Sequence, residues 1–265
     1  MKYALINGKK TEATKGAIGF CPGCGSELIA KCGEVKINHW AHKGKLNCDT
    51  WWENETEWHR SWKGHFPVEW QEVVHKADNG EKHIADVKTE QDWTIEFQHS
   101  YLNPEERRSR DTFYPKLVWV VDGMRRKLDL RQFQRALEES RAFNKEPLIL
   151  QVSFPDECRL LNEWINSESL VLFDFQDVKE TIDTTLWMLL PGISSSKAYL
   201  MRISQNSFVE YHHDERFDRL FKEQILSYRE QIIKTEKLHR KMRRLRSSHS
   251  PLYGKKYNPR RRRRF

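Results

Sequence analysis

The sequence predicts a mixed α/β protein in which a mixed sheet flanked by helices lies between a small cysteine-rich β module and a long basic helix. Four of the five cysteines fall between residues 21 and 48. Over residues 53–146 the sequence pattern predicts a helix, then strands, then another helix. After residue 214, apolar residues recur at the spacing of a helix. At 265 residues, the chain is long enough to bury a sizeable core.

The chain divides into four expected segments. Residues 1–52 form the β module, and residues 53–146 hold the alternating pattern. Residues 147–214 are a β-rich extension, and residues 215–265 are one long helix to about residue 246, followed by a basic tail. Within the extension, apolar runs predict strands at 148–152, 170–173, 186–190 and 198–203, with a helix near 156–166.

Positive charge is concentrated at the C-terminal end. The net charge is +8, yet residues 215–265 hold 18 Lys/Arg against 5 Asp/Glu, so the remaining body is mildly acidic. Residues 237–265 hold 13 Lys/Arg and no acid. A basic tail on an acidic body favours a polyanionic partner, and nucleic acid is the first candidate.

The compartment is predicted from what the sequence lacks. No apolar run approaches the roughly 18 residues that span a bilayer, and the first residues carry no secretory signal pattern. We therefore expect a cytoplasmic protein without a membrane span. In a reducing compartment, crowded cysteines suggest a metal site more than disulfides.

A zinc site is predicted in the first segment. Cys21-Pro22-Gly23-Cys24 places two thiolates where both can face one ion, and the glycines let backbone amides turn toward the sulfurs. Zinc takes four ligands, so His39, His42 and Cys48 compete for two places. The preferred set is Cys21, Cys24, His42 and Cys48, with His39 as the substitute, and Cys32 is disfavoured because it lies in an expected strand. The alternative is unliganded thiols beside a hydrogen-bonded histidine pair.

A carboxylate cluster is predicted on a β-hairpin in the second segment. Residues 83–88 and 93–100 have β character, and a turn-like stretch separates them. Glu96 and Gln98 share one face of the second strand, and Asp86 lies on the first. A helix over residues 52–63 adds Glu57.

These acids suit a magnesium or manganese site. Hard divalent cations prefer carboxylate oxygens and keep positions open for water and phosphate. Glu57, Asp86 and Glu96 are the expected metal ligands and, with Gln98, the expected catalytic residues. Such an ion would polarise a phosphodiester. The spacing alone is a weak signal, because exposed acids are common on hairpins.

Basic residues near this cluster are predicted to contact nucleic acid. His59 and Lys63 share one helical face, and Asn103 and Pro104 predict the start of a charged helix. The full expected set of nucleic-acid contacts is His59, Lys63, Arg107, Arg108, Arg243, Arg244, Arg260, Arg261 and Arg262. Tyr253 and Tyr257 could stack on bases, and the alternative for the tail is a solubilising role.

In order, these motifs resemble the CoiA-like competence protein family over roughly residues 1–125. The residues that carry the resemblance are Cys21-Pro22-Gly23-Cys24, His39-Trp40-Ala41-His42, Glu57-Trp58-His59 with Lys63, Ala85-Asp86-Val87, Glu96-Phe97-Gln98-His99-Ser100, and Tyr114 with Val118-Trp119-Val120-Val121. The resemblance implies a restriction-endonuclease-like PD-(D/E)XK core behind a zinc-finger-like module. It also implies DNA more than RNA as partner, in uptake, recombination, phage or defence processes.

Two positions depart from the family pattern. Asp86 would be its aspartate and Glu96 its second acid, but Gln98 takes the lysine position and Ala85 stands before Asp86 in place of proline. Glutamine cannot act as a charged base and can only orient water by hydrogen bonds.

The sequence therefore predicts a metal-dependent deoxyribonuclease. The alternative is a catalytically inactive adaptor of the same fold, which binds nucleic acid or a protein partner through the zinc module or the C-terminal helix.

Overall fold

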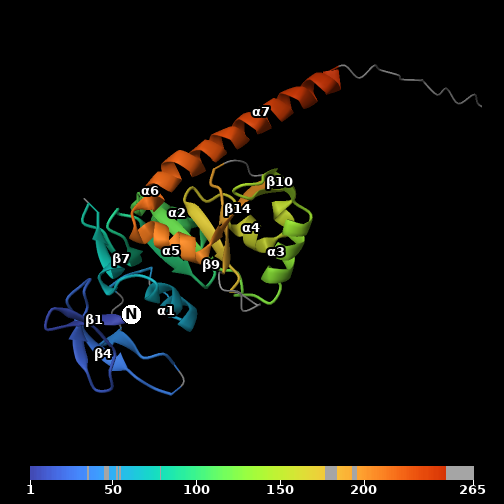
Figure 1. Ribbon diagram of the computed structural model, residues 1–265. Coiled ribbons are helices and arrows are strands. Elements are labelled where there is room, and N and C mark those ends of the chain that lie inside the picture. Colours follow the sequence, from blue (N-terminus) through green and yellow to red (C-terminus); the bar gives the residue numbers. More distant parts are fainter. Residues whose placement is uncertain are drawn as a thin grey trace, which may run out of the picture.

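The computed structural model describes residues 1–34, 36–44, 48–51, 53, 55–77, 79–176, 184–192 and 196–248. The chain folds into two sheets with helices on both faces of the larger one, and a long helix extends from the body (Figure 1). The predicted mixed α/β architecture is confirmed. No helix within the described residues combines the length and apolar character that a bilayer crossing needs.

The N-terminal module is a five-stranded antiparallel sheet in the order β2-β1-β3-β4-β5. Its strands are β1 (Tyr3–Ile6), β2 (Lys9–Glu12), β3 (Ile18–Phe20), β4 (Glu27–Lys31) and β5 (His39–His42). Its core is small: Ala4, Leu28 and Trp40 are buried, and Cys21 packs with them. A core of this size gains from a metal staple.

The larger sheet has nine strands in the order β10-β11-β14-β13-β12-β9-β8-β7-β6. These are β6 (Gln71–Lys76), β7 (Lys82–Lys88), β8 (Thr94–Gln98), β9 (Leu117–Asp122), β10 (Arg141–Asn144), β11 (Ile149–Val152), β12 (Leu170–Asp174), β13 (Thr185–Leu189) and β14 (Ala198–Ser204). β9 runs parallel to both β8 and β12, and the other neighbours are antiparallel. β9 is buried throughout, as its continuous apolar run predicts.

The expected segments 53–146 and 147–214 contribute to this one sheet. β12 pairs with β9 over five residues, and β10 and β11 pair across the expected boundary. The boundary at 146/147 therefore does not separate two sheets. The four strands expected in the extension correspond to β11, β12, β13 and β14.

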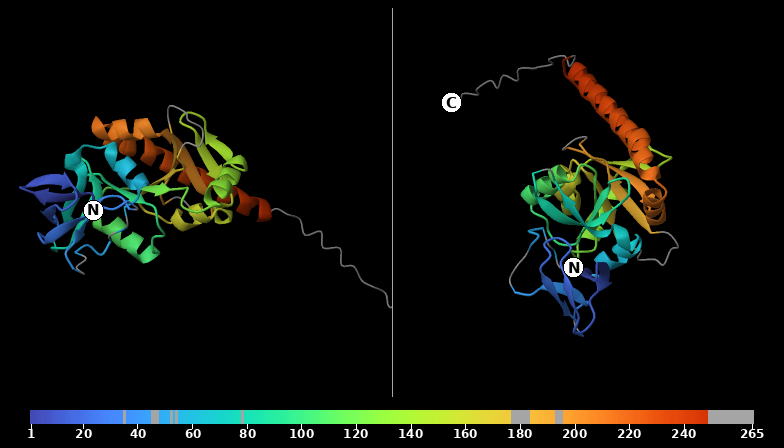
Figure 2. Two further views of the ribbon diagram at one scale, coloured as in Figure 1. Left: turned by 90° about the horizontal axis from the view of Figure 1, so that it is seen from below. Right: turned by 90° about the vertical axis from the view of Figure 1, so that its left-hand side faces the viewer.

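Helices cover both faces of the nine-stranded sheet (Figure 2). One face packs against α1 (Glu57–Gly64), α5 (Gln205–His213) and the start of the C-terminal helical rod. The other packs against α2 (Pro104–Phe113), α3 (Asp129–Glu138) and α4 (Arg159–Trp164). Short 3-10 turns lie at Val68–Trp70 and Pro155–Glu157. The order α1, β6, β7, β8, α2, β9 agrees with the predicted helix, strands, helix and strand.

Two helix starts follow from local sequence. Thr56 caps α1 in a reciprocal capping box with His59, which fixes the rotation of the helix. Asn103 caps α2 ahead of Pro104, as predicted.

The predicted C-terminal helix is a continuous rod. It comprises α6 (Arg216–Arg219), a π-helical turn at Leu220–Ile225 and α7 (Leu226–Ser248). Ile232 is buried against the body, Glu236 still contacts Tyr199 of β14, and beyond Glu236 the rod leaves the sheet (Figures 1 and 2).

Candidate functional site

Three cysteines and one histidine gather in the N-terminal module. The ligand atoms of Cys21, Cys24, His42 and Cys48 lie within 4.8 Å of one another, and this is the one such group found among the described residues. Sγ of Cys21 lies 3.6 Å from Sγ of Cys48, and Sγ of Cys24 lies 3.3 Å from Nε2 of His42. The structure thus gathers the set that was preferred from the sequence.

Local geometry explains why these four residues meet. Cys21 follows β3, and a turn closed by a hydrogen bond from the Gly25 amide to the Cys21 carbonyl brings Cys24 beside it. Gly25 has a φ of +73°, which favours glycine there. His42 ends β5, which pairs with β4.

The other candidate ligands lie outside the cluster. His39 is three residues from His42 on the same strand, so the two side chains leave opposite faces. Nδ1 of His39 lies 2.8 Å from the carbonyl oxygen of Ile37. Cys32 contacts the carbonyl oxygen of Ala13 at 3.6 Å.

The thiols of the cluster have divergent acidities. Burial alone would raise the pKa of Cys24, but hydrogen bonds with Ser26 and His42 lower this pKa to about 6. Burial and the neighbouring Cys21 raise the pKa of Cys48 to about 12. Neighbouring thiolates repel one another, so these three thiols can all be ionised only when a cation is bound between them. Three thiolates and one imidazole are a donor set that zinc takes. This cluster could therefore bind zinc.

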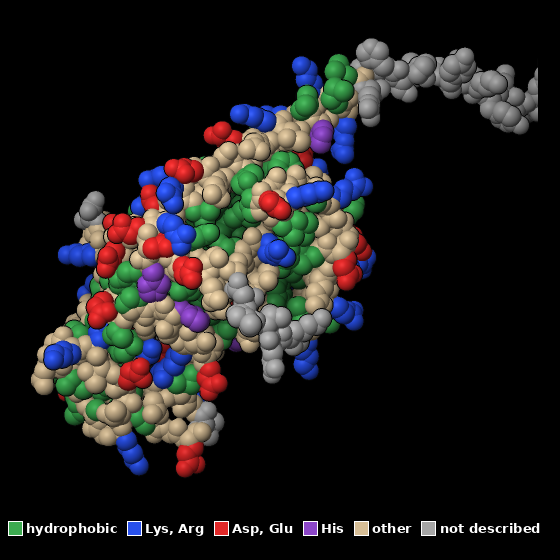
Figure 3. Space-filling model, in the orientation of Figure 1, with side chains coloured by type: hydrophobic (Ala, Val, Ile, Leu, Met, Phe, Trp, Pro, Cys, Tyr) green, Lys and Arg blue, Asp and Glu red, His purple; other side chains and the backbone are tan. Residues whose placement is uncertain are grey.

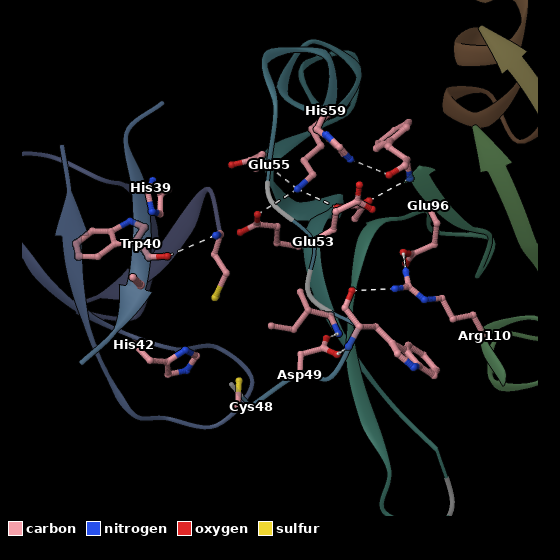
Figure 4. Close-up of a pocket in the computed structure, with 18 of the residues that line it drawn as sticks. His39, Trp40, His42, Cys48, Asp49, Glu53, Glu55, His59, Glu96 and Arg110 are labelled. Atoms are coloured by element: carbon pink, nitrogen blue, oxygen red, sulfur yellow. Dashed lines mark hydrogen bonds and ion pairs between the residues drawn. The ribbon is translucent and has the colours of Figure 1, made fainter. Parts of the chain in front are cut away.

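A second cluster lies in a pocket of about 420 Å³ between the module and the nine-stranded sheet (Figure 4). The module contributes His39, His42 and Cys48 to its wall, and the acids converge from loops and strands of the sheet. We call this cavity the acid pocket. Its acidic lining residues are Asp49, Glu53, Glu55, Glu72, Asp86 and Glu96, against the two basic side chains Lys63 and Arg110.

Lys63 sits among three of these acids. Its Nζ lies 3.2 Å from Glu55, 3.2 Å from Glu72 and 2.9 Å from Oδ1 of Asp86, and its side chain is 5% exposed. Burial alone would lower the pKa of Lys63, but the three carboxylates, led by Asp86, hold it well above its ordinary value. Lys63 is therefore a permanent cation inside the pocket.

Asp86 and Glu96 lie where β7 and β8 separate. In the described part of the chain the ladder between these strands consists of Val87↔Ile95 and Lys88↔Thr94. Beyond it, Oδ2 of Asp86 accepts a hydrogen bond of 3.0 Å from the Phe97 amide. Both acids line the acid pocket, as the hairpin prediction requires.

Glu96 is the acid most perturbed by its surroundings. One oxygen accepts a hydrogen bond from Arg110 at 3.2 Å, and the other is buried without a partner among the described residues. Burial and the negative charge of Asp86 raise the pKa of Glu96 to about 8. The free oxygen of Glu96 is open to a further partner, whereas both oxygens of Asp86 already contact Lys63 or the Phe97 amide.

The structure does not bring Glu57 to the acid pocket. Glu57 is exposed in the first turn of α1, because the capping box at Thr56 turns His59 and Lys63 inward instead. The acids of the pocket that the sequence reasoning missed are Asp49, Glu53, Glu55 and Glu72. Glu72 has a φ of +49° and interrupts the pairing of β6 with β7, and no sequence pattern predicts such a backbone position.

Gln98 and His59 are buried and make hydrogen bonds to neighbouring groups of the protein. The Gln98 amide donates to Glu53 at 2.7 Å and to the Ser100 carbonyl at 3.2 Å. Nε2 of His59 lies 2.9 Å from the Phe97 carbonyl oxygen, and burial lowers its pKa. Neither His59 nor Lys63 is exposed for phosphate contact in the way that the sequence suggested.

The arginines that were predicted to contact nucleic acid differ in their exposure. Arg107 is buried, packs over Trp164 at 5.3 Å and donates to the Glu163 carbonyl, so it is a structural residue. Arg108, Arg243 and Arg244 are exposed. Arg260, Arg261 and Arg262, with Tyr253 and Tyr257, lie outside the described residues.

Asp49 connects the two clusters. It follows Cys48 directly, and its carboxylate accepts hydrogen bonds of 2.8 Å from the Ile84 amide and 2.9 Å from the Trp51 amide. Ile84 is on β7, two residues before Asp86. Figure 4 shows Cys48 and Asp49 side by side at the edge of the acid pocket.

Comparison with known proteins bears on the module that holds the cysteine cluster. Residues 7–50 match the family model described as competence protein CoiA, N-terminal domain, and this range includes all four clustered ligands. This match supports the predicted resemblance to CoiA-like competence proteins over the N-terminal module, and it suggests a competence-related role. The match ends before α1, so β7 and β8, which carry Asp86 and Glu96, lie outside it. No curated protein and no solved structure matches the chain.

Proposed function

We propose that the acid pocket is the active site of a metal-dependent nuclease that hydrolyses phosphodiester bonds of DNA in a competence-related process. The observation that carries the proposal is the pairing of Asp86 with Glu96, whose pKa is raised to about 8 and whose free oxygen is buried in the pocket. A carboxyl group whose pKa is shifted by burial and by a specific charged neighbour inside a cavity is a candidate functional residue.

Asp86 and Glu96 are the residues that would hold Mg²⁺ or Mn²⁺. When bound, such an ion would stabilise charge on the phosphate and activate water for attack. The surplus of carboxylates in the lining leaves the pocket negative even with Lys63 and Arg110 counted, which favours a divalent cation.

Lys63 supplies the positive group that Gln98 cannot. Its ammonium lies 2.9 Å from Asp86 and is held by Glu55 and Glu72. Its three N–H groups face Asp86, Glu55 and Glu72, so it acts by holding these carboxylates in place and by adding positive charge beside the two acids. Gln98 instead orients Glu53, and Arg110 orients Glu96.

The test is digestion of plasmid and oligonucleotide DNA with Mg²⁺ or Mn²⁺, compared with a reaction without divalent ion. We expect Asp86→Asn and Glu96→Gln each to abolish cleavage while the protein stays folded by circular dichroism. Glu57→Gln is the matched control, since Glu57 is exposed outside the pocket, and it should cleave like the wild type. Cleavage retained by both pocket variants would refute the proposal.

One observation favours a second function, a nuclease-fold adaptor without catalysis. Lys63 already neutralises part of the charge of Asp86, Glu55 and Glu72, as a substitute for a metal ion would. The adaptor predicts DNA binding without cleavage products in either metal, and no binding of Mn²⁺ at the acid pocket by calorimetry.

A further inference from the structure

We propose that a groove beneath α7, remote in the fold from the acid pocket's strands, binds single-stranded nucleic acid. The groove consists of two adjoining hollows of about 1020 and 340 Å³, which share Arg141, Ser153 and Phe154. The β10 and β11 edge of the nine-stranded sheet lines both hollows, α7 covers the larger one, and α3 lines the smaller one. We call it the α7 groove.

α7 is held at a defined position over the larger hollow. Glu236 of α7 contacts Lys197 and the Tyr199 hydroxyl, each at 2.6 Å, on the β14 side. Ile232 is buried one turn earlier. Past these anchors α7 overhangs the sheet edge, and Met242 and Arg243 line the larger hollow.

The groove exposes an aromatic ring at its centre. Phe154 is 62% exposed and borders both hollows, and Phe143 lines the larger one. What distinguishes Phe154 from other exposed rings is its place between two hollows, where its face is open to a flat apolar partner. Unpaired bases stack on such rings, whereas the bases of a duplex are already stacked on each other.

Unpaired positive charge lies on the side of this ring that faces the larger hollow. None of the described residues that line that hollow is acidic, whereas Glu139 and Glu157 of the smaller hollow both pair with Arg135. Lys197 is paired with Glu236, but Arg141 and Arg243 form no ion pair within the described chain. Figure 3 shows Lys and Arg side chains next to hydrophobic ones on the surface beneath α7. Cations beside an exposed ring suit a phosphate backbone that carries unpaired bases.

A second copy of the chain fits this groove less well. The exposed apolar residues Leu238, Met242 and Leu245 could pair with another α7. However, that helix would bring its own Lys241 and Arg243 against the same charges, and like charges oppose the contact.

The experiment measures binding of the full-length chain to fluorescent oligothymidine of about 16 nucleotides, and to a duplex of equal length, by anisotropy across salt without divalent ions. We expect Phe154→Ala to weaken oligothymidine binding about tenfold and to leave duplex binding unchanged. Phe154→Tyr should retain the affinity, and Phe154→Leu should lose it, because leucine is apolar but offers no ring. Arg141→Glu and Arg243→Glu should each weaken binding and reduce the salt slope by about one.

Matched controls are available on the same chain. Tyr101→Ala removes a ring that is also 62% exposed, and Lys9→Glu reverses an exposed charge in the N-terminal module. Both should bind like the wild type. Three results would each overturn the proposal: wild-type affinity in Phe154→Ala, an equal loss for duplex and single strand, or displacement of oligothymidine by poly-glutamate at equal charge. None of these results depends on cleavage at the acid pocket, which digestion tests separately.

Discussion

Oδ1 of Asp49 lies 2.8 Å from Nδ1 of His83, and this contact joins the loop of the cysteine cluster to β7. The same carboxylate accepts from the Ile84 amide, so a residue adjacent to Cys48 holds the strand that presents Asp86. The hydrogen bonds of this one side chain therefore link the N-terminal module to the strand that lines the acid pocket.

Replacing Asp49 should destabilise the fold. Asp49→Ala removes the acceptor for His83, Ile84 and Trp51, and buried donors left unpaired cost about 1 kcal/mol or more each. We expect the free energy of unfolding in urea to fall by roughly 2–4 kcal/mol. Asp156→Ala, at an exposed position, is the control and should change little. Equal stabilities of the two variants would contradict a connecting role.

The cysteine cluster should hold about one zinc ion per chain. Elemental analysis of the purified protein should find zinc, and Cys21→Ser or Cys48→Ser should lose it. His39→Ala should retain it, because His39 lies outside the cluster. Chelation should lower the melting temperature, since the binding free energy of a structural zinc is folding free energy. Retention of zinc by both cysteine variants would show that the ion binds elsewhere.

Lys63 should be essential for stability as well as for the proposed chemistry. Lys63→Met leaves the carboxylates of Glu72 and Glu55, which are buried, and of Asp86, which is partly exposed, without their shared counterion. Removing one partner of a buried ion pair costs about 3–5 kcal/mol. The loss should shrink at acidic pH, where the carboxylates gain protons. The exposed Lys15→Met serves as the control, and a loss independent of pH would argue for packing instead.

Glu96 gives the protein a predictable pH dependence. Its pKa is raised from 4.5 to about 8 by burial and by Asp86, so the folded state holds this proton more tightly than the unfolded state. Its contribution to stability is full below 4.5 and is lost as the pH rises toward 8. Urea unfolding across this window should show that the free energy of unfolding of Glu96→Gln increases relative to that of the wild type as the pH rises. A constant difference would mean that Glu96 does not titrate there.

The same shift predicts how metal binding responds to pH. Because the ion must displace the Glu96 proton, Mn²⁺ affinity should increase up to about pH 8, with proton release. Calorimetry in buffers of different ionisation enthalpy measures the released protons. Glu96→Gln should release none, whereas the outside variant Glu57→Gln should behave like the wild type.

Local patterns predicted much of this molecule. The Cys21–Cys24 turn, the Asn103 cap and the apolar strand β9 are encoded in contiguous residues, and each was found where expected. The hairpin that carries Asp86 and Glu96 also follows from alternation along the chain.

Other features depend on contacts between distant segments. A strand pattern does not tell which face of β5 meets the cysteines, so His39 stayed a substitute for the preferred His42 until the structure placed both side chains. The rotation of α1 is fixed by Thr56 and His59, and it turns Glu57 outward. Glu72 enters the pocket through an irregular backbone position that periodicity cannot detect.

The pairing of β9 with β12 determines where the chain can be divided. A fragment ending near residue 146 would lack β12 and leave β9, a strand buried along its whole length, as an open sheet edge. Such edges pair with other chains and promote aggregation. Truncation at the apparent end of the nuclease-like segment would therefore yield insoluble protein, whereas shortening the rod beyond Glu236 would leave the sheet intact.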